Sequence, residues 1–438
     1  MLPDNLLSRR SALKLGAASA ALTMPFSGPA GAADPVGFAT WSAAVDEVKA
    51  HLAAFEKETG IATAYSNAPF AQYRDTMVAK FTGGAPVDML WMSDAWLPEF
   101  AQAGWIAPID RFPELTAYNA VTSDFCTASL MYQGKQYGLT YYTDYMGFLY
   151  NEELLAKAGF AVPPTTWDEV STQAAAIKAK GLLDYPVVIG MAAESWQIEF
   201  ISALVFSHGG RMVDDAGKPV MAEAGCGAAA ALGWLADAVQ THKILSPGCV
   251  QTGELEVLKT ASAGRAAFVL LPKYRLRVLN DKQQSQVAGK FKQALMPMGP
   301  SGSHATVGWI RFYGVTPHAL ATPDRARASA RLMEWFAGKA DGDYRFPKIL
   351  VKDLALGFGI TSLFADPEVR RDFAAYGDPD LMASQQRLAR KKDTIAPWFG
   401  EWNDANGTAW QQAVLGQASV EQALKTSAAK WTELRNAG

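Results

Sequence analysis

The sequence has few of the residues that metal centres and disulfide frameworks need. It holds three cysteines and five histidines in 438 residues, and the histidines stand far apart with no ligand spacing. It contains no C-x-x-C, H-E-x-x-H, G-x-S-x-G or G-x-x-x-x-G-K-[ST] motif. The sequence therefore predicts no metal site, no cofactor and no histidine base. Cys226 and Cys249 could form one disulfide, but their spacing leaves this open.

An excess of positive charge is also missing. The net charge is −3 at pH 7, whereas nucleic-acid binders need many surplus Lys and Arg residues to neutralise phosphates. This excludes nucleic acid as a partner. Outside the N-terminal leader, no apolar run approaches the roughly 18 residues that a membrane helix requires. With 49% hydrophobic residues, the mature chain is expected to be soluble and large enough for two or more cores.

Residues 1–33 have the features of an export signal. Arg9 and Arg10 are followed by Lys14 and a modest apolar run, and Ala30-Gly31-Ala32 provides an A-x-A cleavage site. Paired arginines in this position are typical of the bacterial twin-arginine route. We expect a cleaved leader and a periplasmic location.

The first part of the mature chain alternates strands with helices. Strands are predicted at 36–40, 61–65 and 87–91, and helices at 46–59 and 72–82. The third strand is almost entirely apolar, as expected for a central parallel strand buried on both faces. This alternation predicts an α/β fold with an open, mainly parallel sheet.

The stretch from 134 to 170 organises the rest of the chain. It predicts a strand over 136–142, an interruption at Thr143-Asp144, a second strand over 146–150 and a helix over 152–158. Thr166 and Glu169 are spaced as a capping box for the next helix. Further strands are predicted at 187–192, 264–271 and 307–315, and further helices at 196–207, 224–241, 325–337, 368–376, 379–388, 402–415 and 420–434.

Several motifs occur in the same order as in one known family. They are L-A-A-F-E-K-E-T-G-I, P-V-D-M-L-W, G-K-x-Y-G-L, L-Y-N-x-x-L-L-x-K-A-G, P-P-x-T-W-x-E and G-Q-A-S-V-E-Q-A-L. This pattern resembles the extracellular solute-binding proteins of family 1, the maltose-binding-protein-like components of ABC importers. The resemblance spans nearly the whole mature chain.

The resemblance implies a periplasmic-binding-protein-like fold of type II, in which two α/β lobes joined by hinge strands enclose a ligand cleft. By analogy, lobe one is 34–142 plus 305–357, and lobe two is 143–304 plus 358–438. It also implies a monomer that binds a carbohydrate, delivers it to membrane permease subunits and is not an enzyme.

The resemblance assigns binding roles to five positions. Asp144 lies where family members often carry a carboxylate that binds sugar hydroxyls, although it could instead cap local backbone at the hinge. Trp196, Gln197, Tyr274 and Trp402 match positions of aromatic and polar contacts with sugar.

The predicted strand ends supply further candidates. Trp41 and Ser42 follow the first strand, where Trp41 could stack on a sugar ring or belong to the core. Asp94 follows the third strand and could accept hydroxyls or cap a helix. Trp309 and Arg311 lie in a second crossing between lobes. Arg311 could form an inter-lobe ion pair or donate to a ligand oxygen.

Three alternatives stay open. Lys273, Arg275 and Arg277 lie close together in sequence, so with Arg311 they could bind an acidic, phosphorylated or sulfonated sugar or polyol, or they could form a solvated basic face. Asp144 with Glu194 or Glu199 could supply the two carboxylates of a secreted glycoside-processing enzyme. The protein could also be a sensor that docks on a receptor rather than an importer.

Overall fold

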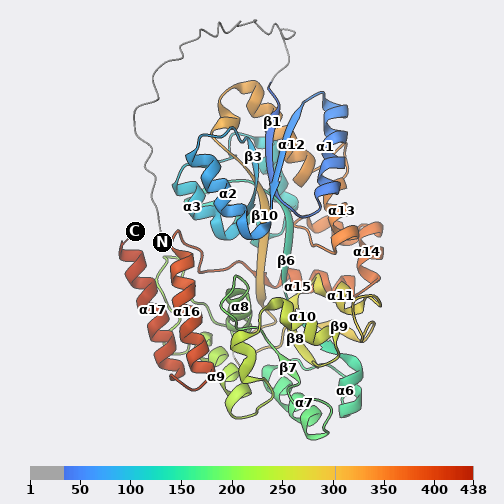
Figure 1. Ribbon diagram of the computed structural model, residues 1–438, viewed down its shortest axis with the longest axis vertical. Helices are drawn as coiled ribbons and strands as arrows, with labels where there is room; N and C mark the ends of the chain where they lie inside the picture. Colours follow the sequence, from blue (N-terminus) through green and yellow to red (C-terminus); the bar gives the residue numbers. More distant parts are fainter. Residues whose placement is uncertain (1–33, 301, 438) are drawn as a thin grey trace, which may run out of the picture. The chain divides into compact units, whose positions relative to one another are not determined.

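The computed structural model describes residues 34–300 and 302–437. The leader predicted over residues 1–33 lies outside the described residues. One mixed sheet organises the described chain, with strand order β2-β1-β3-β10-β6-β8-β7, β11 beside β10 and β9 beside β6 (Figure 1). A short hairpin pairs β4, Met131–Tyr132, with β5, Lys135–Gln136. The predicted α/β fold class is confirmed.

Three parallel strands place their carboxyl ends at one edge of this sheet. They are β1 (Val36–Trp41), β2 (Thr63–Ala68) and β3 (Met89–Ser93). β3 is buried along its whole length, as its apolar sequence predicts. Residues that follow these strands therefore lie near one another.

Two long strands cross the middle of the sheet and change partners along their length. The first half of β6 (Leu139–Asn151) pairs with β10 (Thr306–Val315), and its second half pairs with β8 (Phe268–Pro272) and β9 (Phe291–Ala294). The predicted interruption at Thr143-Asp144 is wrong. Both residues pair across to β10, and Thr143 Oγ1 donates to the carbonyl of Trp309 at 2.9 Å.

The helices gather around the two ends of these long strands (Figure 1). Around β1–β3 lie α1 (Val45–Thr59), α2 (Phe70–Thr82), α3 (Leu97–Gln102), α12 (Pro323–Ala337) and α13 (Arg345–Leu354). Around β7 (Val187–Val188) and β8 lie α6 (Glu152–Ala158), α7 (Trp167–Ala179), α8 (Gln197–Ser207), α9 (Gly227–Gln240), α10 (Glu254–Ser262) and α11 (Arg275–Asn280).

The C-terminal part is helical, as predicted. It contains α14 (Pro367–Ala374), α15 (Pro379–Arg387), α16 (Phe399–Val414) and α17 (Val420–Ala437), with the short strand β11 (Ala389–Arg390) between α15 and α16. Two short helices, α4 (Pro113–Thr116) and α5 (Asp124–Ser129), precede β4.

Local sequence signals explain several element boundaries. The predicted helix over 152–158 has the bounds of α6 and ends at Gly159, which adopts a left-handed φ of 96°. The capping box of Thr166 and Glu169 is present at the start of α7. The strand predicted over 187–192 is shorter than expected, because β7 comprises only Val187 and Val188.

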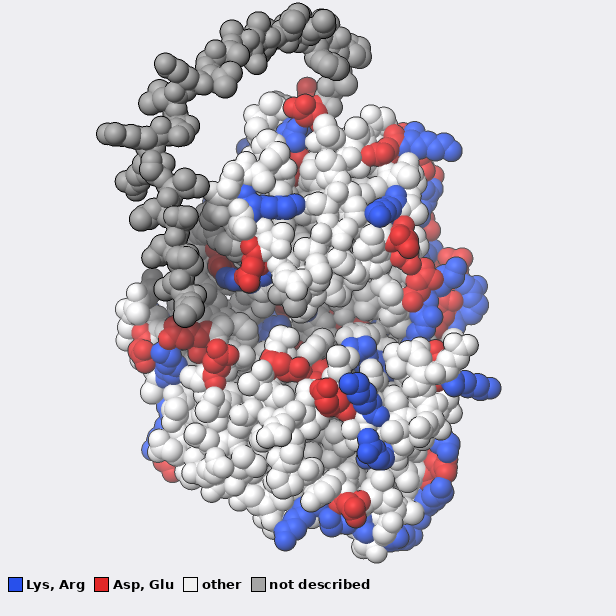
Figure 2. Space-filling model, in the orientation of Figure 1, with Lys and Arg blue, Asp and Glu red and all other residues white. Residues whose placement is uncertain are grey.

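Three predictions from the sequence concern a disulfide, membrane-spanning helices and metal sites. All three cysteines are free, and the thiol of Cys226 contacts the carbonyl of Arg211 instead of Cys249. Within 34–300 and 302–437, no helix combines the length and the apolar character needed to span a bilayer, and no group of three or more His, Cys, Asp or Glu residues is arranged to hold a metal. Both signs of charge are interspersed on the face drawn in Figure 2.

Candidate functional site

A cavity of about 540 Å³ lies beside the long strands β6 and β10. Its wall draws on segments that are far apart in sequence: the loop after β1, the start of α2, β6, β10, the residues before α8, α11 and the end of α13. The volume falls within the range of pockets that hold small organic ligands.

Aromatic side chains from the strand ends form one side of this cavity. Trp41, the last residue of β1, stacks on Trp91 with ring centroids 5.3 Å apart. Phe70 packs edge-on against Trp41 at 5.5 Å and is 40% exposed. Trp91 is fully buried, so it supports Trp41 from behind and leaves Trp41 and Phe70 to face the cavity.

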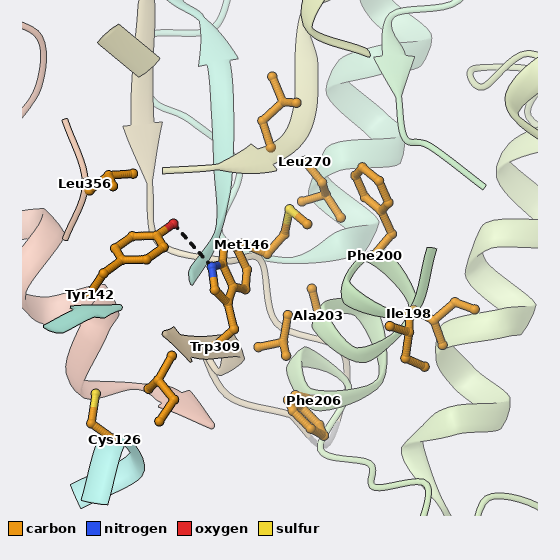
Figure 3. Close-up of a cluster of buried hydrophobic side chains, with 14 of the residues drawn as sticks. Cys126, Tyr142, Met146, Ile198, Phe200, Ala203, Phe206, Leu270, Trp309 and Leu356 are labelled. Carbon is orange, nitrogen blue, oxygen red and sulfur yellow. Dashed lines mark hydrogen bonds between the residues drawn. The ribbon is translucent and has the colours of Figure 1, made fainter. Parts of the chain in front are cut away.

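A second aromatic group comes from β6, β10 and the segment before α8. Trp196 packs edge-on against Trp309 at 5.3 Å. Trp309 is fully buried, and its indole N–H points to the hydroxyl of Tyr142 at 3.4 Å (Figure 3). Trp196 and Tyr274 are half-buried and line the cavity. Together with Trp41, they offer flat apolar faces of the kind that cover the C–H face of a sugar ring.

Arg311 brings a guanidinium group to the cavity, and buried charges hold it from behind. Its Nη1 donates to Asp94 at 3.2 Å and to the carbonyl of Ile310 at 2.9 Å. Lys392 lies 3.7 Å from the same Asp94 oxygen and 2.8 Å from Glu199. Burial acts to lower the pKa of Lys392, but the two carboxylates outweigh burial and the pKa is raised.

Asp144 belongs to a separate buried pair. Its Oδ1 accepts from the backbone N–H of Tyr145 at 2.9 Å, and its Oδ2 lies 3.4 Å from Nζ of Lys273. Lys273 also donates to the carbonyl of Ala355 at 2.9 Å. Burial raises the pKa of Asp144 to about 6 against the attraction of Lys273, and burial lowers the pKa of Lys273.

The basic run after β8 is not the uniform solvated face that was one alternative. Lys273 is buried, 1% exposed. Arg275 donates through Nε and Nη2 to both oxygens of Glu254, at 2.6 and 2.9 Å. Only Arg277 is exposed, and it donates to the carbonyl of Lys352 at 2.8 Å.

Five of the ten residues predicted to bind ligand line the cavity. They are Trp41, Trp196, Tyr274, Trp309 and Arg311.

The other five predicted residues do not line it. Ser42 is exposed and donates to Asn67 at 2.8 Å. Gln197 is buried and donates to the carbonyl of Met191 at 2.8 Å. Trp402 is fully buried between α16 and α17, where it donates to the carbonyl of Ser427 at 3.0 Å. Asp94 begins a 3-10 turn instead of capping it, and Asp144 makes the local backbone contact that was its alternative.

Several residues that line the cavity are not among the ten predicted ligand-binding residues. Phe70 follows β2 at the same sheet edge as Trp41, so the end of a parallel strand was an available signal. Arg275 enters the sequence-based prediction only through the alternative of an acidic ligand, and it lines the cavity. Leu354 and Leu356 close the cavity from the end of α13, and no local pattern marks them because tertiary packing alone brings them there.

Comparison with known proteins identifies the family and the fold. Residues 32–342 match the family model of the bacterial extracellular solute-binding proteins. A Deinococcus radiodurans protein named "probable ABC transporter-binding protein" is 24% identical, with 90% of this chain and 91% of that protein covered.

Solved structures agree on the fold. The maltose-bound MalE3 of T. maritima superposes with a TM-score of 0.75 at 21% identity, covering 91% of this chain and 100% of that one. The sugar-binding protein MalE of Xanthomonas citri gives a TM-score of 0.77 at 19% identity, covering 91% and 96%. The fold is therefore that of the type II periplasmic binding proteins, as predicted. Because the family model covers well over half of the sequence, the chain belongs to the bacterial extracellular solute-binding protein family.

Proposed function

We propose that the protein binds a carbohydrate in the aromatic cavity and delivers it to the permease subunits of an ABC importer. The observation that carries this proposal is the set of half-buried aromatic faces, Trp41, Trp196 and Tyr274, around one cavity of about 540 Å³. Aromatic faces of this kind cover the apolar side of a sugar ring. The maltose bound to the T. maritima relative and the transporter named in the D. radiodurans relative support the same reading.

The cavity walls come from both of the lobes that we propose. Trp41 and Arg311 belong to lobe one, 34–142 plus 305–357, while Trp196 and Tyr274 belong to lobe two, 143–304 plus 358–438. A ligand that touches both sets makes its full contacts only when the lobes are closed, so binding would shift the population toward the closed form. The continuous strands β6 and β10 would act as the hinge.

The location of the protein follows from its leader and family. We infer export through the twin-arginine route to the periplasm, from Arg9 and Arg10 in the leader and from the extracellular character of the family. Export would place a monomeric binding protein beside the outer face of its permease. Replacing both arginines with lysine should leave the precursor uncleaved in the cytoplasm, and an unchanged export yield would contradict the route.

Buried contacts favour binding without chemistry. The proposed glycoside-processing alternative needs two carboxylates that face the sugar. Asp144 pairs with Lys273, Glu199 pairs with Lys392, and Glu194 accepts from the backbone N–H of Glu254 at 2.7 Å. None of these three carboxylates lines the cavity. Recovery of an intact saccharide after long incubation is expected, and a cleaved product would restore the alternative.

A thermal-shift screen over mono-, oligo- and acidic saccharides tests the proposed function, because a ligand that binds only the native protein raises its melting temperature. For each saccharide that binds, calorimetry of Trp196→Ala should show an affinity loss of about tenfold, since about 1–2 kcal/mol of stacking is removed. Tyr185→Ala is the matched control, because Tyr185 is a 40% exposed aromatic residue that does not line this cavity. Equal affinities of the two variants would contradict the site.

A further inference from the structure

The polar groups that face the cavity differ in kind from those that lie behind it. The charged residues that line the cavity, among those described, are Arg275, Arg277, Arg311, Asp281 and Asp353. Arg275 and Arg311 are the half-buried cations of this set. The carboxylates that pair with them, Glu254 and Asp94, are 2% and 0% exposed and do not line the cavity. A ligand would therefore meet the cations and not their counter-ions.

Each arginine keeps donor groups available after pairing. Arg311 uses only Nη1 for Asp94 and Ile310, so its Nε and Nη2 donate to no described residue. Arg275 uses Nε and Nη2 for Glu254, so its Nη1 has no described acceptor. The side chains of Arg311 and Arg275 are 12% and 22% exposed, which leaves each guanidinium partly accessible from the cavity.

The two arginines are held rigidly. Both oxygens of Glu254 accept hydrogen bonds from Arg275, and the guanidinium of Arg275 lies 4.9 Å from the ring centroid of Tyr274. Asp94 holds Arg311, whose guanidinium lies 5.9 Å from the ring centroid of Trp91. A pre-oriented guanidinium loses little entropy when it binds an oxyanion, and its planar donor geometry matches carboxylate, sulfate and phosphate groups.

Hydroxyl recognition usually needs acceptors as well as donors. A neutral sugar presents hydroxyl groups whose protons are best accepted by carboxylates or amides. Two carboxylates also line this cavity: Asp353 is exposed, and the half-buried Asp281 already accepts from the backbone N–H of Gln283 and the side chain of Gln284, both at 2.7 Å. Because Asp281 is already hydrogen-bonded and Asp353 is exposed, the half-buried part of the lining favours a ligand whose oxygen atoms accept hydrogen bonds.

We propose that the ligand is a carbohydrate with an anionic group, and that Arg275 and Arg311 bind this group together. This inference rests on the proposed function and specifies its substrate class. Arg311 belongs to the proposed lobe one and Arg275 to lobe two, so one oxyanion between them would draw the lobes together. The aromatic faces of Trp41 and Trp196 would hold the sugar rings.

The test compares matched pairs of neutral and acidic saccharides by calorimetry. Glucose and galactose are titrated against glucuronate and galacturonate, and glucose against its 6-sulfate and 6-phosphate, so that the carboxylate, sulfate and phosphate arms are separated. At least one acidic form should bind about tenfold or more tightly than its neutral partner, because charge-assisted hydrogen bonds are stronger than neutral ones. Its affinity should fall as salt rises from about 50 to 300 mM.

Variants then locate the anion. Arg275→Gln and Arg311→Gln should each weaken the acidic saccharide by about tenfold and its neutral partner by less than about threefold. Arg331→Gln is the control, because this exposed arginine donates to Glu334 and does not line the cavity, and it should change neither affinity by more than about twofold. Should Arg311→Gln fail to fold, Arg311→Lys and the salt dependence of the wild type still test the proposal.

The possible failures are distinguishable. If neutral saccharides bind as tightly as their acidic partners, or if the arginine variants weaken both equally, the anionic ligand is excluded while the carbohydrate function stands. If no saccharide of either kind raises the melting temperature or gives heat of binding, the proposed function itself is overturned.

Discussion

Lys392 and Lys273 are both almost completely buried near the cavity, yet their charges are balanced differently. Lys392 lies between two carboxylates, Asp94 and Glu199, whereas Lys273 faces the single carboxylate of Asp144. The pKa of Lys392 is raised and that of Lys273 is lowered. Two carboxylates overcome the cost of burying an ammonium group, and one does not.

This difference separates two roles. Lys392 stays charged because its pKa is raised, and its partner Asp94 supports Arg311, which lines the cavity. The pair of Asp144 and Lys273 lies where β6 meets the end of β8, and Asp144 can lose its charge within an ordinary pH range, because its pKa is about 6. We therefore expect the first cluster to matter for binding and stability, and the second mainly for stability.

The largest effect should come from Lys392→Met. Removing this ammonium group leaves Glu199 buried without a cation and leaves Asp94 with Arg311 alone. Breaking a buried ionic cluster on one side costs about 3–5 kcal/mol of unfolding free energy, which urea unfolding followed by circular dichroism would measure at pH 7. Removing Glu199 as well, in Lys392→Met with Glu199→Gln, should recover part of the loss. A loss below about 1 kcal/mol would contradict the role of Lys392 as the buried cation of this cluster.

A smaller and pH-dependent effect is expected for Lys273→Met. At pH 8 the variant buries Asp144 without its cation and should lose about 1–3 kcal/mol. At pH 4 Asp144 carries a proton in both proteins, because its pKa is about 6, and the wild type then buries an unpaired ammonium group. The variant should therefore be equal to or more stable than the wild type at pH 4. Urea unfolding midpoints of both proteins from pH 4 to pH 8 measure this difference. A loss of stability of the same size at both pH values would contradict the pairing of Lys273 with an Asp144 that is charged only at the higher pH.

Local patterns predicted most of the fold. The helix over 152–158, the capping box at Thr166 and the buried strand over 87–91 all depend on neighbouring residues, so the sequence contains the needed signal. The interruption that the sequence predicts at the polar pair Thr143-Asp144 is absent. In the folded protein Thr143 donates to the carbonyl of Trp309 in β10, and Asp144 accepts from the backbone N–H of Tyr145 and forms an ion pair with Lys273, so β6 continues.

The site was less predictable than the fold, because tertiary packing decides which side chain pairs with each charged residue. Asp94 follows β3 as predicted and Asp144 lies inside β6, but buried lysines more than 100 residues away in sequence pair with both carboxylates. Trp402 matched a family position, yet α17 covers it. The strand ends did predict Trp41, since the carboxyl edge of parallel strands is a general location for ligands.

The smallest effect on binding is expected at Asp144, which belongs to the pair that we assign mainly to stability. Asp144→Asn should change the affinity for any saccharide that binds by less than about twofold, since Asp144 does not line the cavity and its oxygens face Tyr145 and Lys273. Calorimetry measures the affinity, and Trp196→Ala, titrated in parallel, shows the loss expected when a residue that lines the cavity is removed.

The same variant should alter the pH dependence of stability. The folded-state pKa of Asp144, about 6, exceeds its ordinary value of 3.8, so the contribution of its protonation to stability is full below pH 3.8 and is lost as pH rises through 6. From pH 4 to pH 7 the wild type should lose on the order of 2–3 kcal/mol relative to Asp144→Asn. If Asp144→Asn lost affinity tenfold and left the pH dependence of stability unchanged, Asp144 would instead break its contact with Lys273 and bind the ligand. The two buried lysines would then both serve the cavity, and the distinction between a binding cluster and a structural pair would fail.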